Sequence, residues 1–114
     1  MVRFGNFEVE YNRNAPDKVS VRIETDDKGE VWLPKCDIAR AYGVFVQSVN
    51  AGLKSLAKTG DFDEYRDVRV EHFTYNGKNC SVDLYSLETI IALGFRMNGL
   101  KCEAFRKWAA RRQK

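Results

Sequence analysis

The polar residues best suited to bind a partner lie between residues 46 and 58. Apolar side chains recur there at helical spacing, which predicts a helix with Val49 and Leu53 on its buried side. The opposite side carries glutamine, asparagine and lysine. Amide side chains can hydrogen-bond to adenine edges, and lysine suits phosphates or guanine. We therefore expect a DNA-binding face on this helix. Its candidate residues are Gln47, Ser48, Asn50, Lys54 and Lys58.

A shorter helix is expected immediately before it. Pro34 suits a first helical turn, where its missing N–H costs nothing. Ile38 and Tyr42 follow at helical spacing, and Gly43 can adopt the left-handed conformation that ends a helix. Two helices joined by a tight turn over residues 34–58 make a helix-turn-helix. An ordinary corner between two helices has the same pattern and is the structural alternative.

Two apolar residues lie at the entry to the second helix. Phe45 occupies the position where Ser or Thr would cap the helix better, and Val46 follows it. We expect at least one of them to be partly exposed and to contact a partner. The second helix also has no arginine, the commonest base-reading residue, which counts against the DNA-binding interpretation. A protein-interaction module that uses this apolar face is therefore the alternative function.

The residues before the helix pair alternate between apolar and polar types. This pattern predicts an N-terminal strand and loop over residues 1–18, with the loop at residues 12–17. It also predicts a β-hairpin over residues 19–33, turning at residues 26–29. This hairpin would lead directly into the helix pair.

A second hairpin is expected at residues 67–85. Asn76-Gly77 is a strong signal for a two-residue type I′ turn, and that turn places Phe73 opposite Cys80. A hairpin that follows a helix-turn-helix suggests the wing of a winged-helix domain, and Lys78 near its tip would reach a DNA backbone. The alternative is a hairpin that covers the core. The face expected to join the core carries Phe73, Cys80, Val82 and Leu84.

Residues 86–114 are expected to form two C-terminal helices, the first capped by Ser86. From residue 96 onward there is one acidic residue, Glu103. The basic residues of this stretch are Arg96, Lys101, Arg106, Lys107, Arg111, Arg112 and Lys114. Lys107, Arg111 and Lys114 would form an outward stripe that suits a polyanion. A solvated surface helix is the alternative.

Four residues near the C-terminus have competing roles. Arg96 and Arg106 are candidate phosphate ligands, and Arg106 could instead bracket Glu88 or a helix end. We expect Asn98 to cap a helix and Trp108 to join the core.

Length and composition exclude several classes of protein. The 114 residues suit one domain, and the net charge is +3. We find no apolar run of membrane-spanning length and no signal peptide, so we expect a cytoplasmic protein that makes no membrane contact. Three cysteines without a C-x-x-C pair fit a reducing compartment. One histidine, His72, and the lack of a glycine-rich phosphate loop lead us to expect no enzyme, no metal and no cofactor.

Three sequence blocks resemble the RhuM family of bacterial virulence-associated and mobile-element proteins. They read VWLPKCDIARAYGV, YSLETIIALGFRMN and KCEAFRKWA, and the resemblance covers residues 19–110. RhuM-like proteins are similar to the N-terminal domains of phage antirepressors and BRO proteins. The resemblance implies a bacterial or phage gene with a DNA-binding or regulatory role.

Together these patterns predict a single α+β domain of winged-helix-like architecture. It would contain an N-terminal β-hairpin, a helix-turn-helix, a β-hairpin wing and C-terminal helices. The expected function is non-catalytic binding of duplex DNA. A homodimer or a protein partner is the further expectation for its assembly.

Overall fold

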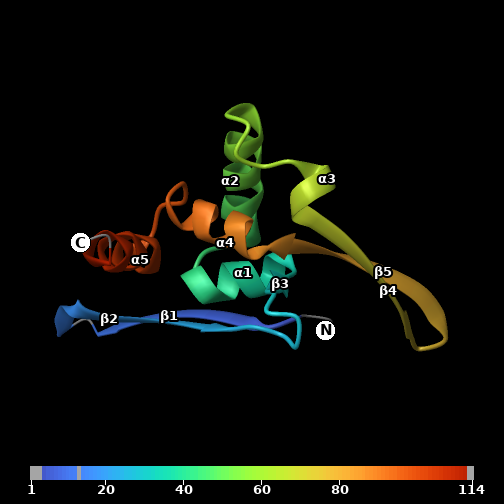
Figure 1. Ribbon diagram of the computed structural model, residues 1–114, viewed down its shortest axis with the longest axis horizontal. Helices are drawn as coiled ribbons and strands as arrows, with labels where there is room; N and C mark the ends of the chain where they lie inside the picture. Colours follow the sequence, from blue (N-terminus) through green and yellow to red (C-terminus); the bar gives the residue numbers. More distant parts are fainter. Residues whose placement is uncertain (1–3, 13, 113–114) are drawn as a thin grey trace.

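The computed structural model describes residues 4–12 and 14–112, which fold into an α+β arrangement (Figure 1). In this part of the chain there are two antiparallel sheets and five helices. The strands are β1 Asn6–Asn12, β2 Ala15–Glu24, β3 Trp32–Leu33, β4 Val68–Tyr75 and β5 Lys78–Ser86. The helices are α1 Lys35–Tyr42, α2 Val46–Lys58, α3 Glu64–Asp67, α4 Leu87–Gly94 and α5 Leu100–Arg111.

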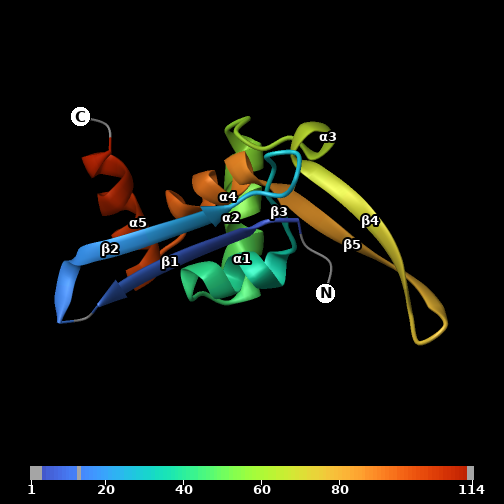
Figure 2. The same ribbon diagram turned by 60° about the horizontal axis from the view of Figure 1, so that its bottom comes forward.

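The elements lie in layers along an elongated molecule. The β1–β2 ribbon covers α1 and α5, while α2 stands on the far side of α1 and α4 (Figures 1 and 2). The principal extents are 47 × 30 × 27 Å. Among the described residues, no helix is both long enough and apolar enough to span a bilayer.

The predicted pair of helices forms at the predicted positions. Gly43 has φ of 64°, and its N–H donates to the Arg40 carbonyl, so α1 ends there as expected. Residues 43–45 make the turn, and α2 then begins at Val46. The buried side of α2 carries Val49, Leu53 and Leu56, as the helical spacing predicted.

The core is centred on three aromatic rings from distant parts of the chain. Phe7, Tyr42 and Phe105 lie with their ring centroids 5.4 to 5.8 Å apart. The Tyr42 hydroxyl donates to the Ile90 carbonyl at 2.6 Å, and burial raises the pKa of this phenol. These contacts hold β1, α1, α4 and α5 together.

The hairpin predicted over residues 19–33 does not form. β2 pairs instead with β1, with Val21 opposite Val9, and β3 pairs with the end of β5. The turn at residues 26–29 does form, but Trp32 and Leu33 find their partners in Ser86 and Tyr85. The sequence pattern marked the strands correctly, but which strands pair is set by the core behind them.

The loop predicted at residues 12–17 is also shorter than expected. β2 begins at Ala15, which pairs with Asn12 beyond an irregularity in the register next to Tyr11. Pro16 is compatible with this position because neither strand of a two-stranded ribbon has a neighbour on its outer edge.

The β4–β5 hairpin has the predicted turn and register. Asn76 and Gly77 both have positive φ, at 51° and 75°, and Phe73 pairs with Cys80. The apolar face of this hairpin was expected to join the core, and it does so only at the base of the hairpin. Leu84 is fully buried, whereas Cys80 and Val82 are half-buried because the outer hairpin projects beyond the body.

The C-terminal helices follow the prediction closely. Ser86 caps α4, its Oγ accepting from the Thr89 N–H at 3.3 Å. Phe105 is buried, and the Trp108 ring stacks on it at 6.1 Å. The prediction for Asn98 is wrong, since Gly99 occupies the cap position of α5 and Asn98 is exposed.

Candidate nucleic-acid interface

An exposed stripe of polar side chains runs along α2. Gln47, Lys54 and Lys58 are all exposed, and they follow one another at two-turn and one-turn intervals. The buried side of the same helix packs against α1 and α4, which fixes the direction of this stripe. Three of the five candidate residues of α2 therefore face solvent together.

The other two candidates lie on the flanks of α2. Ser48 is half-buried and lines a hollow shared with Arg96 and Met97 near the end of α4. Asn50 lies on the other flank, and its Oδ1 is buried without a hydrogen-bond partner among the described residues. Neither side chain belongs to the exposed stripe.

A groove of about 720 Å³ separates α2 from the base of the β4–β5 hairpin. Its polar lining mixes both signs of charge, and its apolar floor comes from α2, β4 and β5. The charged residues are Lys35, Lys54, Glu64 and Asp83. Burial raises the pKa of the Tyr85 phenol to about 12, with Asp83 and Glu64 adding to the effect. At neutral pH this phenol keeps its proton and offers a hydroxyl.

The apolar entry to α2 is exposed, as predicted. Phe45 is 82% exposed and Val46 is 38% exposed. Phe45 occupies the N-cap position without a side-chain hydrogen bond to the helix. The backbone of Gly99 approaches Val44, so α5 starts beside this turn, and its first residue Leu100 is 60% exposed.

The remaining candidate cations are spread along the molecule. Lys78 lies near the tip of the hairpin, while Lys107 and Arg111 lie on α5 at the opposite end (Figures 1 and 2). Lys107 Nζ also forms an ion pair with Glu103 Oε1 at 3.3 Å. The structure therefore does not gather the predicted basic residues into one cluster.

The two candidate phosphate ligands are engaged within the fold. Arg106 Nη1 donates to the Gly94 and Met97 carbonyls at 3.0 and 2.9 Å. Arg106 therefore brackets the end of a helix, which was one of its two predicted structural roles. The other predicted role, a contact with Glu88, is wrong. Arg96 joins α4 to the end of α2, because its guanidinium donates to Ser55, Thr59 and Asp61 at 3.0 to 3.3 Å.

One buried polar cluster was not anticipated from the sequence. Asp67 is only 2% exposed, and it accepts from the Ser86 hydroxyl at 3.0 Å and the Arg66 guanidinium at 2.9 Å. Burial alone would raise the pKa of this carboxyl. The hydrogen bonds from Arg66, the Asp63 N–H and Ser86 outweigh burial and hold the pKa below its ordinary value. Asp67 sits in an acidic stretch, so the sequence pattern resembled a solvated turn.

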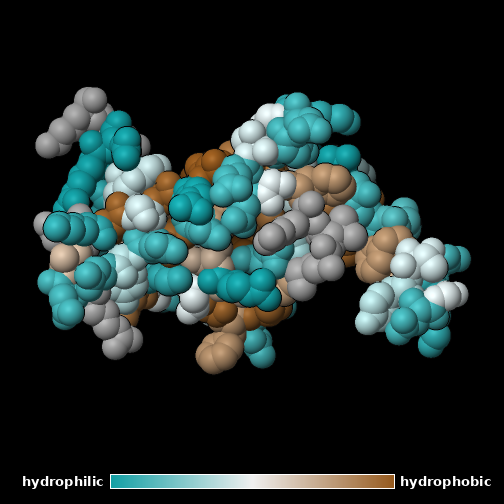
Figure 3. Space-filling view, turned by 90° about the horizontal axis from the view of Figure 1, so that it is seen from below, coloured by the Kyte–Doolittle hydropathy of each residue, from teal (hydrophilic) through white to brown (hydrophobic). Residues whose placement is uncertain are grey.

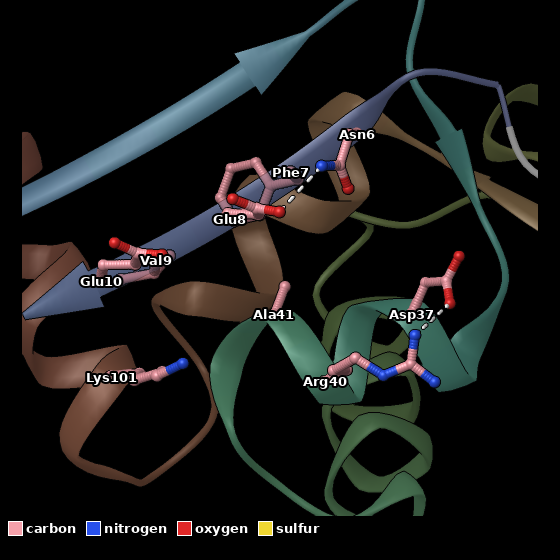
Figure 4. Close-up of a pocket in the computed structure, with 9 residues that line it drawn as sticks. All are labelled: Asn6, Phe7, Glu8, Val9, Glu10, Asp37, Arg40, Ala41 and Lys101. Carbon is pink, nitrogen blue, oxygen red and sulfur yellow. Dashed lines mark hydrogen bonds and ion pairs between the residues drawn. The ribbon is translucent and has the colours of Figure 1, made fainter.

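A second hollow, of about 310 Å³, lies between β1 and α1 (Figure 4). Glu8 and Glu10 line it from β1, and Arg40 and Lys101 line it from α1 and α5. Arg40 also bonds the buried Asp37 at 3.5 Å. Because carboxylates form one wall, this hollow is poorly suited to a phosphate group.

The comparisons with known proteins identify no relative. Neither the family models, the curated proteins nor the solved structures contain a match to this chain. The resemblance to the RhuM family remains a prediction. Within residues 4–12 and 14–112, no group of three or more His, Cys, Asp or Glu side chains is placed to hold a metal ion.

Proposed function

We propose that this protein binds duplex DNA without catalysis, with α2 in a groove of the duplex. The observation that carries the proposal is the exposed stripe of Gln47, Lys54 and Lys58 on a helix whose other side is fixed in the core. A major groove admits an α-helix, and this stripe combines a base-reading amide with two phosphate-binding cations.

In this proposal the domain is winged-helix-like. α1 and α2 are the helix-turn-helix, and the projecting β4–β5 hairpin is the wing. Lys78 near the tip of the hairpin would contact a phosphate to one side of α2. The RhuM resemblance supports a regulatory role in a bacterial or phage mobile element.

The basic residues of α5 would act on a separate part of the duplex. The long axis of 47 Å corresponds to about 14 base pairs at 3.4 Å each, so Lys107 and Arg111 would reach phosphates far from the hairpin tip. Lys107 would have to break its ion pair with Glu103 to contact a phosphate, so its expected contribution to DNA affinity is smaller.

The test is binding of a fluorescent random duplex at low salt. The double variant Lys54→Ala/Lys58→Ala should weaken binding at least tenfold, because two phosphate contacts are lost. A matched control, Lys18→Ala/Lys28→Ala, removes two exposed lysines that lie outside α2. No binding by the wild type, or equal losses in both double variants, would contradict the proposal.

A second candidate function rests on a different observation. Phe45 is 82% exposed and is followed by the exposed Val46, so the entry to α2 presents two adjacent apolar side chains to solvent. A protein-interaction role through this surface would explain it. Substituting Phe45 by Ser should then abolish capture of the protein partner and leave DNA binding unchanged.

A further inference from the structure

The outer part of the β4–β5 hairpin has no neighbour along its length. We call residues 71–82 the arm. At the base of the hairpin, β3 pairs with Tyr85 and Ser86, Leu84 is buried, and Arg69 stacks on the Trp32 ring, whereas the arm projects beyond these contacts (Figures 1 and 2). Figure 3 shows the end of the arm standing away from the body, largely hydrophilic at its tip, with apolar atoms where it joins the rest of the molecule. A bare two-stranded ribbon is only marginally stable in water.

The two faces of the arm differ sharply in chemistry. The register places opposed residues on the same face, so each pair forms a rung. One face has the rungs Glu71–Val82, Phe73–Cys80 and Tyr75–Lys78. The outer half of the other face is entirely polar, with the rungs His72–Ser81 and Thr74–Asn79. We call the first of these the apolar face. Tyr75 on it is 65% exposed.

We propose that the apolar face of the arm packs against the same face of a second copy of this chain, with the two arms antiparallel. A two-fold axis through the Phe73–Cys80 rung superimposes that rung on its own copy. The Glu71–Val82 rung then lies over the Tyr75–Lys78 rung of the second copy. Glu71 then lies over Tyr75 of the second copy and Val82 over Lys78, so each Glu71 carboxylate is diagonal to a Lys78 ammonium in the facing rung.

The charges on this face select that orientation. With the arms parallel, each rung would face its own copy, so Lys78 would be diagonal to Lys78 and Glu71 to Glu71, and both pairs would repel. With the arms antiparallel, both pairs attract and the apolar rungs still meet. The face is therefore complementary to itself in only one of the two arrangements.

The size of the contact determines the strength of the dimer. Successive rungs are separated by about 6.8 Å, so the three rungs span only about 14 Å along the arm. This is at the small end of specific interfaces, and a reversible dimer is expected. The arms pair in the absence of a duplex, so the dimer is independent of DNA binding.

Sedimentation equilibrium of the whole chain without DNA tests the proposal. The wild type should show a reversible monomer–dimer equilibrium at concentrations up to about 1 mM. Glu71→Lys and Lys78→Glu should each weaken the dimer by roughly ten- to thirtyfold, since two attractive pairs become repulsive. Asp83→Lys makes a charge change like that of Glu71→Lys, but on the opposite face of the same hairpin, and should leave the dimer unchanged.

Mixing the two charge variants provides the decisive measurement. An equimolar mixture of Glu71→Lys and Lys78→Glu forms two attractive pairs in each heterodimer, so it should restore the wild-type affinity. Glu71 also pairs with Arg69 in its own chain, at 3.1 Å, and rescue in the mixture separates the two effects. A monomeric wild type, a dimer indifferent to both variants, or a mixture that stays monomeric would each overturn the proposal. Circular dichroism of every variant confirms folding.

Discussion

At the scale of single residues, Asp67 shows how a buried carboxylate is stabilised. Its Oδ1 accepts from Ser86, and its Oδ2 accepts from Arg66 and the Asp63 N–H. Replacing Asp67 with Asn removes one acceptor and the charge, so we expect a loss of about 1–3 kcal/mol in the free energy of unfolding at pH 7. Asp27→Asn, at an exposed turn position, is the matched control and should change little.

The same carboxyl predicts a dependence on pH. Its pKa in the folded protein lies below the ordinary value of 3.8, so its contribution is present in full above that value and is lost as the pH falls through the folded pKa. The stability difference between the wild type and Asp67→Asn should therefore narrow in acid. Urea denaturation at pH 7 and in steps below pH 4 measures this, and a constant difference would contradict it.

Phe45 is a position where a substitution should stabilise the protein. It occupies the N-cap of α2 with no side-chain hydrogen bond, and it is largely exposed. Ser at this position can accept from a backbone N–H in the first turn, so Phe45→Ser should raise the free energy of unfolding by about 1 kcal/mol. Phe45→Ala removes the ring without adding a cap and is the control. A loss of stability in Phe45→Ser would show that the ring packs within the monomer.

At the scale of elements, the close contact of α4 and α5 depends on Gly94. A Cβ at this position would lie 2.5 Å from the Phe105 ring and 2.7 Å from the Tyr42 hydroxyl, and both of these groups are in the packed core. Gly94→Ala should therefore lower the free energy of unfolding by about 1–3 kcal/mol, despite the better helix propensity of alanine. Gly52→Ala meets only the end of Leu93, at 2.7 Å, and Met97 at 3.3 Å, so its loss should be smaller. Thermal unfolding of both variants tests this order.

Elements defined by local signals could be predicted from the sequence. Pro34, Gly43 and the apolar spacing between them fixed α1, and Asn76-Gly77 fixed the register of β4 with β5. These signals act within a few residues, so they do not depend on the rest of the fold. The exposed stripe of α2 was predictable for the same reason.

Features that depend on distant partners could not be predicted. β2 pairs with β1 rather than β3 because β1 supplies Phe7 to the ring cluster of the core. Arg106 meets carbonyls at the end of α4, and Asp67 meets the hydroxyl of Ser86; in each case only the folded chain brings the partner near. The flank positions of Ser48 and Asn50 follow from the way α2 is rotated on α1 and α4.

At the scale of the whole molecule, the cations are distributed along 47 Å, and this makes salt dependence informative. Each neutralised phosphate on B-DNA contributes about −0.9 to the slope of log affinity against log salt. If only Lys54, Lys58 and Lys78 contact the duplex, the slope should be about −3. If Lys107 and Arg111 on α5 also contact it, the slope should be roughly −4 to −5.

Variants of α2 separate charge from sequence reading. Lys54→Ala/Lys58→Ala should flatten the slope by roughly two units, whichever total the wild type shows. Gln47→Ala should leave the slope unchanged and reduce any preference among duplex sequences, because a base contact carries information but no charge. Salt titrations of fluorescence anisotropy on random duplexes measure the slopes, and a selected duplex measures the preference. A slope unaffected by the lysine pair would place the contact surface away from α2, and a slope altered by Gln47→Ala would show that the variant disturbs the helix itself.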